Sequence, residues 1–330
     1  MTSSANPSPL TGIWKDARLN FIYTISPTHC GIGQTASSVD LPIARNVVTG
    51  FPILPATALK GVAREMFERH EKFGKDKTFN EMVNTLFGPD LSSQEAKSNQ
   101  SADLKAAALS FTEGRMVAYP VRCLSRPFLH VTCPLILENL ARDVRLLGNF
   151  DLPFPKIKSG LVYVADPALD GQTLVLEDLC YNGKSVSHHS DVEAFAGKLG
   201  EFFPASESAA AGRLKTGLVI IPDEEFNDLI QRSIPVVART VLSKNKTADN
   251  LWYEEHLPPD TLFISFTGHR RQVSLHNTGK KDDASEGAKP LEVMKQFWDE
   301  FSMVQIGGNE TIGNGFCIWE MISPKGGSHV

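Results

Sequence analysis

Long apolar runs are missing from this sequence. No stretch reaches the length of about 18 apolar residues that a membrane-spanning helix needs. Residues 1–10 are polar and contain proline, and no basic segment leads from them into an apolar one, as a secretion signal would require. We therefore expect a soluble, cytoplasmic protein without a membrane partner.

Cysteine is scarce and poorly spaced for cross-linking or zinc binding. The five cysteines are odd in number, widely spread and never in a Cys-x-x-Cys pair: Cys30, Cys123, Cys133, Cys180 and Cys317. This pattern argues against a disulfide framework and against a zinc site. We expect reduced thiols in a chain whose 330 residues and 42% hydrophobic content suffice for a substantial core.

An excess of basic residues, the usual mark of a nucleic-acid binder, is also absent. The formal net charge is -5, whereas neutralising phosphates normally takes a surplus of Lys and Arg. Two windows depart from this average, because each holds four basic residues and no acid: residues 231–246 and 268–281. Solvated basic faces are common, but two such windows keep a polyanionic partner open.

Strand-like and helix-like segments alternate along the chain. Aromatic and β-branched residues predict strands over residues 19–25, 106–111, 116–121, 128–132, 161–165, 173–176, 217–221, 261–267 and 316–322. We expect the segments 106–111 and 116–121 to pair with each other. Apolar periodicity predicts a helix from Thr57, which can cap it, to Phe67. Further helices are expected over residues 79–87, 134–147, 191–203, 223–230 and 290–303, two of them with a proline at the start. The mixture indicates an α+β fold.

Three further segments complete this outline. The polar stretch 90–103 is typical of a flexible insertion, and residues 151–215 show so little periodicity that they are expected to be an insertion as well. The extended segment 234–242 leads into a polar turn over residues 244–250, which predicts a β-hairpin.

A glycine cluster near the C-terminus is the first candidate for chemistry. Glycines leave backbone N–H groups accessible to a phosphate, although a tight turn between a helix and a strand would use the same residues: Gly307, Gly308, Gly313 and Gly315. A P-loop is excluded, because Asn314 and Gly315 stand where Lys and Ser or Thr are required. The glycines after the first strand do not form a dinucleotide-binding fingerprint either.

His29 and Asp40 flank a loop that leaves the first strand, a common place for functional groups. Each also has a structural interpretation, since a histidine there can be a hydrogen-bonded structural residue and an aspartate before Leu-Pro can cap a turn. A second cluster, His188, His189 and Asp191, lacks further metal ligands nearby and is typical of a solvated helix start.

Several strings of the sequence, in their order, resemble the RAMP superfamily of CRISPR-Cas proteins, and more narrowly the backbone subunits of type III-B effector complexes. The strings are PTHCGIG from Pro27, DLPIAR from Asp40, TGFPILPATALKGVAR from Thr49, FGP from Phe87, YPVR from Tyr119, VTCPL from Val131, LWYEE from Leu251, LPPDTLF from Leu257 and QIGGNETIG from Gln305. The chain departs from the family pattern at Thr57, where the family usually has a serine, and at Asn314, where a basic residue is frequent.

The resemblance implies one RAMP-type domain over residues 1–330, with a modified ferredoxin-like (RRM-like) palm, inserted fingers and a protruding thumb. Palm and fingers would come mainly from residues 19–64, 106–150 and 260–322, and the thumb hairpin from residues 234–256. Such a prokaryotic subunit polymerises along a CRISPR guide RNA, beside other subunits of the complex, and complementary target RNA pairs with the guide.

The resemblance also implies an endoribonuclease that acts within the assembled ribonucleoprotein. Asp40 occupies the acidic loop beside which the target is cut, at a nucleotide distorted by the thumb of a neighbouring copy. Because RNA supplies its own nucleophile in the 2′-OH, one carboxylate can suffice, either by accepting the proton or by holding a divalent metal, for which we expect Mg²⁺. The alternative is a scaffold subunit that coats RNA and does not cut it.

The expected RNA contacts are spread over the matching strings. The residues assigned to RNA are His29, Arg45, Thr57, Lys60, Arg64, Arg122, Arg239, Gly307, Gly308, Asn309, Thr311 and Gly313. His29 has a second interpretation, in which it only shapes the Asp40 loop. Guide binding of this kind depends mostly on phosphates, so the target sequence would be read by base pairing.

Overall fold

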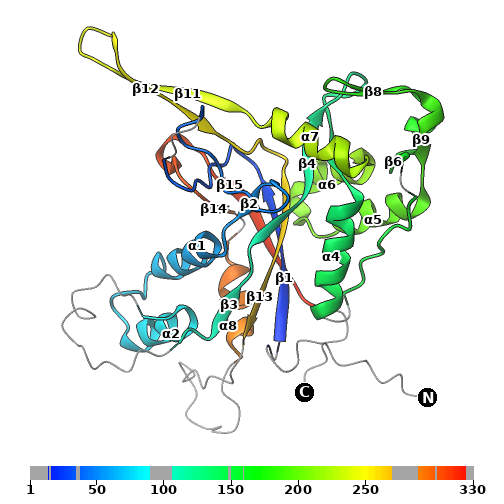
Figure 1. Cartoon of the computed structure of the whole chain (residues 1–330). Helices are drawn as coiled ribbons and strands as arrows, with labels where there is room; N and C mark the ends of the chain where they lie inside the picture. Colours follow the sequence, from blue (N-terminus) through cyan, green and yellow to red (C-terminus); the bar gives the residue numbers. More distant parts are fainter. Residues whose placement is uncertain are drawn as a thin grey trace, which may run out of the picture.

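A large mixed β-sheet forms the centre of the protein in the computed structural model, which describes residues 14, 16–34, 38–89, 106–147, 150–158, 160–269, 289–301 and 303–324. Nine strands follow one another across the sheet in the order β14 (Val304–Gln305), β15 (Phe316–Ile322), β1 (Asp16–Thr24), β13 (Leu262–His269), β4 (Gly114–Arg122), β5 (Phe128–Thr132), β10 (Leu218–Ile220), β6 (Val162–Val164) and β9 (Val186–His188). The predicted mixture of helices and strands is confirmed at this level (Figure 1).

The middle of the sheet is covered on both faces. All eight residues of β13 and the last eight of β1 are buried, which explains why both strands carry apolar residues on both faces instead of alternating with solvated ones. Their side chains feed two hydrophobic clusters, because neighbours such as Phe21 and Ile22 point to opposite faces.

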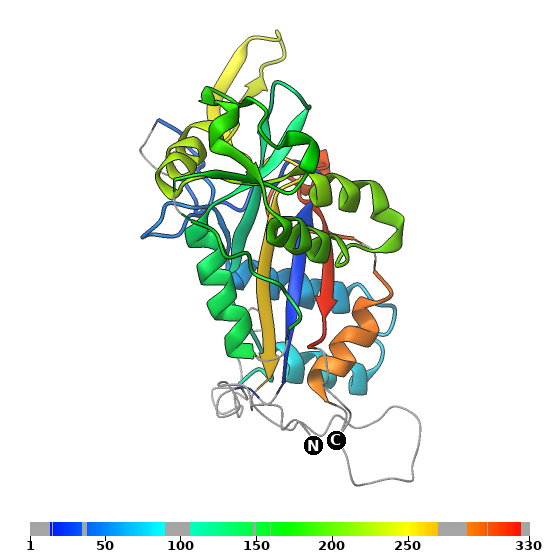
Figure 2. The same cartoon turned by 90° about the vertical axis from the view of Figure 1, so that its right-hand side faces the viewer.

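Helices form the two outer layers. The cluster that contains Ile22 takes up buried residues of α1 (Ala56–Glu68), α2 (Lys77–Phe87), α7 (Asp223–Ser233) and α8 (Pro290–Trp298). The cluster that contains Phe21 takes up residues of α4 (Pro134–Leu147), α5 (Ser190–Gly200) and α6 (Ser208–Gly217). Figure 2 shows α5 and α6 in front of the sheet, with α1 and α2 behind it.

One predicted pairing is wrong. The segments 106–111 and 116–121 do become strands, β3 (Leu109–Phe111) and β4, but they do not pair with each other. Both lie against β13, where Ser110 faces Gly268 and Arg115 faces Ile264. Because β1 occupies the other edge of β13, β3 and β4 follow one another along the same edge of a strand that comes about 150 residues later in the chain.

Two helix boundaries also differ from the sequence prediction. Pro55 occupies the N-cap position of α1 and no side chain caps that helix, so Thr57 is an exposed residue of the first turn rather than the cap. The helix α8 ends at Trp298 and not at residue 303, with the Asp299 N–H bonded to the Lys295 carbonyl. The remaining predicted strands and helices are present with small shifts of their ends.

The segment 151–215 contributes more structure than its weak periodicity indicates. It supplies β6 and β9 to the main sheet and also α5, α6 and the small hairpin of β7 (Leu174–Leu176) and β8 (Leu179–Tyr181). Short 3-10 turns join these elements: Pro167–Leu169, Gly183–Ser185 and Ala205–Glu207. The predicted insertion at residues 90–103 lies outside the described residues, as do the four basic residues of the window 268–281.

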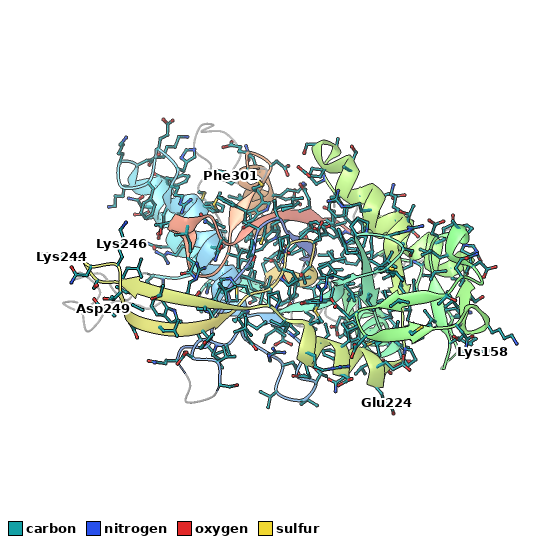
Figure 3. The ribbon with its side chains drawn as sticks, turned by 90° about the horizontal axis from the view of Figure 1, so that it is seen from above. Lys158, Glu224, Lys244, Lys246, Asp249 and Phe301 are labelled. Carbon is teal, nitrogen blue, oxygen red and sulfur yellow. The ribbon has the colours of Figure 1, made fainter. Side chains whose placement is uncertain are left out.

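The predicted hairpin is confirmed. It consists of β11 (Val236–Leu242) and β12 (Ala248–Glu255), which pair antiparallel from Val236–Glu255 outward. Figure 3 shows it projecting from the body of the protein, with Lys244, Lys246 and Asp249 near its tip. None of the helices in the described ranges is long and apolar enough to cross a membrane.

Candidate functional site

The loop that carries Asp40 lies along the inner end of the hairpin. Leu41 forms a parallel bridge with Glu254 of β12: its N–H donates to the Tyr253 carbonyl at 3.0 Å, and its carbonyl accepts from the Glu255 N–H at 3.0 Å. The loop thus extends the hairpin by one residue pair on its β12 side. Its position is set by β12, more than 200 residues later in the chain.

Asp40 is held by the hairpin backbone. Its Oδ2 atom accepts a hydrogen bond from the Tyr253 N–H at 2.8 Å, and the residue is half-buried. This bond holds one oxygen of the carboxylate against the hairpin. The structural interpretation of Asp40 as the cap of a local turn finds no support in this partner, which belongs to a distant strand.

The glycine loop joins the same place from the other side. It runs from β14 to β15 and contains a short 3-10 turn, Glu310–Ile312. The Gly308 N–H donates to the His29 carbonyl at 2.9 Å, and the Gly315 N–H donates to the Pro27 carbonyl at 2.9 Å. Gly308 and Gly315 therefore form part of a tightly packed turn, which was the structural alternative to phosphate binding that the sequence left open.

A buried carboxylate links the hairpin to the glycine loop. The Glu254 side chain is 5% exposed. It accepts hydrogen bonds from four side chains: Trp252 at 2.7 Å, Asn309 at 2.8 Å, His256 at 3.1 Å and Arg239 at 3.3 Å. Burial alone would raise the pKa of Glu254, but these donors outweigh it and the pKa is lowered, so the residue is an anion at the centre of the site.

Two histidines pack beside this carboxylate. His29 and His256 have ring centroids 5.5 Å apart, and His29 donates from Nδ1 to the Glu255 carbonyl at 2.7 Å, since a carbonyl can only accept. Burial lowers the pKa of His256 against the opposing effect of Glu254, and the nearby His29 lowers it further. His29 is buried in the wall of the site.

The structure gathers about half of the predicted contacts and separates the others. Around β12 lie His29, Asp40, Arg45, Arg239, Gly307, Gly308 and Asn309. Thr57, Lys60 and Arg64 lie on α1, Thr311 and Gly313 on the outer part of the glycine loop, and Arg122 at the end of β4.

Each of the four predicted arginine contacts already has a carboxylate partner. Arg45 pairs with Glu255 at 3.0 Å, Arg64 with Glu68 at 2.6 Å, Arg122 with Glu177 at 2.6 Å and Arg239 with Glu254 at 3.3 Å. Arg122 remains 84% exposed and therefore accessible to a polyanion. Burial, and secondly the neighbouring Arg64, lowers the pKa of Lys60, as expected for a cation held beside another cation.

The residues Glu254, Glu255 and His256 were missed as site residues by sequence reasoning. They follow Trp252 and Tyr253 at the end of a hairpin strand, where charged residues are usually solvated. The available signal was the alternation of the strand, which turns neighbouring acids to opposite sides. Their partners lie on segments around residues 29, 43 and 309 and could not be found from local pattern.

The second histidine cluster has the helix-start role that its sequence indicated. His189 accepts from the Asp191 N–H at 3.2 Å and caps α5, and His188 pairs with Glu193 at 3.0 Å. Over the part of the chain that the structure describes, no group of three or more His, Cys, Asp or Glu side chains could hold a metal ion.

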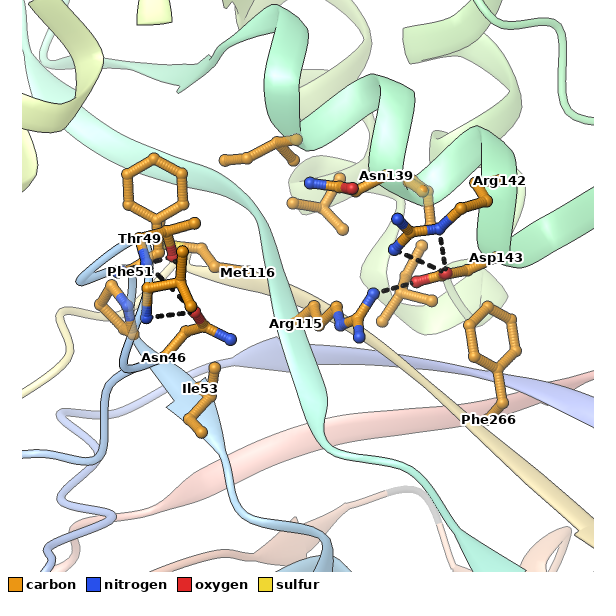
Figure 4. A pocket seen from close by; sticks show the side chains of 16 residues that line it. Asn46, Thr49, Phe51, Ile53, Arg115, Met116, Asn139, Arg142, Asp143 and Phe266 are labelled. Atoms are coloured by element: carbon orange, nitrogen blue, oxygen red, sulfur yellow. Dashed lines mark hydrogen bonds and ion pairs between the residues drawn. The ribbon is translucent and has the colours of Figure 1, made fainter. Parts of the chain in front are cut away.

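A separate pocket of about 350 Å³ lies between the loop before β2 (Ile53–Leu54) and the helix α4. Its floor is apolar, with Met116, Ile264 and Phe266, and Arg115 pairs with Asp143 at its rim (Figure 4). None of the predicted site residues lines it. We therefore place the candidate site at the hairpin and not in this pocket.

Comparison with known proteins agrees with these features. A model of the RAMP superfamily matches residues 21–318, and the chain therefore belongs to the RAMP superfamily, as its motifs predicted. Within it, the chain is similar to the CRISPR system Cmr endoribonuclease Cmr4 of Pyrococcus furiosus, with 30% identity over 315 residues that cover 93% of this chain and 97% of the relative.

Two solved structures have the same fold. The crystal structure of oligomeric Cmr4 from Pyrococcus furiosus gives a TM-score of 0.65 at 26% identity, covering 93% of this chain and 98% of that one. A chain in the cryo-EM structure of the type III-B Cmr-beta complex bound to cognate target RNA gives 0.67 at 19% identity, covering 94% and 98%. The second likeness concerns the fold alone.

Proposed function

We propose that this chain is the guide-RNA-binding backbone subunit of a type III-B CRISPR effector complex and that it cuts guide-paired target RNA at regular intervals. The observation that carries the proposal is the placement of Asp40, whose carboxylate is fixed at 2.8 Å by the backbone of the projecting hairpin. The 30% identity over nearly the whole length to a Cmr endoribonuclease supports the same assignment.

The parts of the fold take the following roles in this proposal. The sheet around β1, β13 and β15 is the ferredoxin-like palm, α1 and α2 belong to the fingers, and the hairpin of β11 and β12 is the thumb. The hairpin exposes a series of apolar side chains that the chain itself does not cover: Val236, Val237, Val241, Leu242, Leu251 and Tyr253. Such a surface is suited to pushing between stacked bases or against a neighbouring copy.

Cleavage uses the 2′-OH of the target as the nucleophile. A nucleotide distorted by the thumb of the neighbouring copy presents its 2′-OH in line with the scissile phosphate, and Asp40 accepts the proton or orients the reacting groups. Holding such a geometry accounts for several kcal/mol of the barrier, with about 7–11 as the upper end. The 2′-oxygen bonds to phosphorus as the bond from phosphorus to the 5′-oxygen breaks, and that oxygen takes up a proton, so the products are a 2′,3′-cyclic phosphate end and a 5′-hydroxyl end. The site is complete only where two copies meet on RNA.

Asp40 also fits a divalent metal, for which we propose Mg²⁺. Mg²⁺ is usually held by one or two carboxylates, with water and substrate phosphate as the remaining ligands, so the single half-buried carboxylate of Asp40 suits it. When bound, the ion would stabilise negative charge on the phosphate. The Tyr253 N–H would then keep the carboxylate turned toward the substrate.

The first test replaces Asp40 in a complex assembled with guide RNA. We expect Asp40→Ala to lower the single-turnover rate of target cutting by about 10²–10⁴-fold, the usual contribution of a proton-transfer group, with guide and target binding retained. Cutting and binding are measured on the same preparations with labelled target. Cutting at the wild-type rate would contradict the catalytic role and leave the scaffold function.

Two controls examine the chemistry of the wild-type complex. A target with 2′-deoxy nucleotides at the cut positions is expected to resist cutting, and undiminished cutting would exclude 2′-OH attack. Chelation with EDTA is expected to stop cutting, and Mg²⁺ to restore it. Cutting that persists in EDTA would leave Asp40 as a proton acceptor without a metal.

A further inference from the structure

Glu255, the last residue of β12, contacts the Asp40 loop or the adjoining segment through all four of its polar groups. Its N–H donates to the Leu41 carbonyl at 3.0 Å and its carbonyl accepts from His29 Nδ1 at 2.7 Å. Its Oε2 atom accepts from the Ile43 N–H at 3.1 Å, and its Oε1 atom accepts from Arg45 Nη2 at 3.0 Å. The side chain is 14% exposed, so water competes only weakly for these hydrogen bonds.

Arg45 completes this attachment from the loop side. Its Nη1 atom donates to the Gly50 carbonyl at 3.2 Å, and its side chain is 22% exposed. The guanidinium therefore joins the end of the Asp40 loop to the hairpin and to the turn at Gly50. A charge-assisted pair of this kind, largely screened from solvent, is stronger than an exposed one.

These contacts tie the candidate catalytic carboxylate to one strand at three successive points. The Tyr253 N–H binds Asp40 itself, the backbone of Tyr253 and Glu255 binds Leu41, and the Glu255 side chain binds Ile43 and Arg45. Only the last point depends on a side chain of the hairpin, so it is the one that a substitution can release. Ile43 is 1% exposed, and its N–H would then be left buried without an acceptor.

We propose that Glu255 is a positioning residue for RNA cleavage: together with Arg45 it holds the segment from Leu41 to Arg45 on β12 and so fixes Asp40 relative to the hairpin. This inference rests on the proposed function. Arg45 then acts through Glu255, and its predicted contact with guide RNA is not needed to explain its effect on cutting. A shift of about 1 Å in a reacting group is enough to slow a reaction by about 10²-fold.

The test compares Glu255 variants in complexes assembled with guide RNA. Glu255→Ala is expected to slow single-turnover cutting by about 10²-fold at saturating target, while the Kd for target changes by no more than about 2-fold. Glu255→Gln keeps an acceptor for the Ile43 N–H but not for Arg45, so its rate should lie between those of Ala and wild type. If the alanine variant fails to assemble, Glu255→Gln alone tests the proposal, with the same two measurements.

An exchange of the two charges tests whether the ion pair between Arg45 and Glu255 matters for cutting, or only the identity of each residue. The double variant Arg45→Glu with Glu255→Arg restores the ion pair but not the acceptor for Ile43, and it should cut faster than either single exchange. Amide hydrogen exchange of residues 41–45 should rise in Glu255→Ala and fall back in the double variant. The matched control is Asp299→Asn, which breaks the exposed pair with Lys295 (2.9 Å) on α8 and should leave cutting unchanged.

Cutting by Glu255→Ala at the wild-type rate overturns the positioning role, and so does a loss of cutting that is matched by an equal loss of target binding. Asp40→Asn is measured in parallel. If Asp40→Asn also cuts at the wild-type rate, the proposed function itself fails. If Asp40→Asn is inactive while Glu255→Ala is fully active, only the positioning role fails.

Discussion

At the scale of single residues, two glycines of the same loop have different reasons to be glycine. Gly307 has a φ of 93°, and a Cβ there would lie 2.3 Å from the His29 carbonyl oxygen. Gly313 has a φ of 83°, but a Cβ there would meet only the Phe316 ring, at 4.0 Å. At Gly307 a residue with a Cβ would suffer both an unfavourable backbone conformation and a clash with another chain segment. At Gly313 it would suffer only the unfavourable backbone conformation.

We expect Gly313→Ala to lower the free energy of unfolding by about 1–2 kcal/mol, the cost of a left-handed residue with a Cβ. Gly307→Ala should cost clearly more, because the contacting atom is backbone and cannot move aside without breaking the Gly308–His29 hydrogen bond of 2.9 Å. Urea denaturation of both variants provides the measurement. Equal losses of stability in the two variants would show that the close approach at Gly307 does not add to the cost of a Cβ there.

The candidate site could be predicted only where its residues are marked by local sequence. Asp40 and His29 stand in a loop after a strand and in recognisable strings, so both were found. Glu254 and Glu255 also stand in a matching string, LWYEE, but they were not assigned, because strand alternation turns them to opposite sides without showing which segments bury them. Glu254 is buried by Asn309 of the glycine loop, 55 residues away, and Glu255 by the segment around Ile43, 212 residues away.

At the scale of elements, the hairpin has an inner and an outer half with different partners. The inner half, from Trp252 to Glu255, contacts the Asp40 and glycine loops. The outer half, beyond the pair of Thr240 with Leu251, is exposed on both strands. The outer half thus contributes little to the stability of this chain, and in the proposed function it is the part that reaches the RNA duplex.

Replacing residues 241–250 by Asn-Gly would close the strands after Thr240 and Leu251 with a tight turn. We expect this shortened hairpin to assemble with guide RNA and to bind target, but to cut it poorly, because the target nucleotide is no longer displaced. Mapping of cut positions on a labelled target is the measurement. Wild-type cutting with regular spacing would show that the outer half is not the distorting element.

A helix or strand could be predicted where the residues within it, or at its ends, carry a clear sequence signal. The strands β1 and β5 were expected from their aromatic and β-branched residues, the hairpin from its polar turn and α4 from the proline at its start, and all are present. The strands β8 and β9 have three residues each, too few for a pattern, and α6 has an alanine-rich stripe with weak periodicity. The pairing of β3 and β4 was mispredicted because β13, which lies against both of them, comes much later in the chain.

At the scale of the whole molecule, one histidine inside the sheet couples folding to pH. His130 on β5 is fully buried, and burial lowers its pKa to about 4. Its Nε2 lies 3.3 Å from the Tyr23 hydroxyl, which donates to Asp260 at 2.5 Å. The folded chain therefore holds this histidine neutral, whereas the unfolded chain protonates it near pH 6.5.

Because the unfolded state binds the proton more readily, stability should fall as the pH drops from about 6.5 to about 4, by about 3 kcal/mol from His130 alone. His256, whose pKa is also lowered, acts in the same direction, and Glu254, whose pKa is lowered from 4.5, adds to the loss of stability only below about that pH. His130→Gln removes one titrating group, so its unfolding free energy should depend less steeply on pH in this window. Denaturation curves at several pH values give both slopes, and identical slopes would contradict the assignment.

The arrangement of strands β1 and β15 has a practical consequence for testing the proposed assembly. The two strands run antiparallel with Leu19 opposite Ile322, while Thr24 and Cys317 mark the end nearest the hairpin. The start of β1 and the end of β15 therefore lie together at the pole of the molecule remote from Asp40 (Figure 1). In the proposed complex, a fluorophore attached beside either of them would lie away from the Asp40 loop, and energy transfer between fluorophores on neighbouring copies would report the distance between those copies.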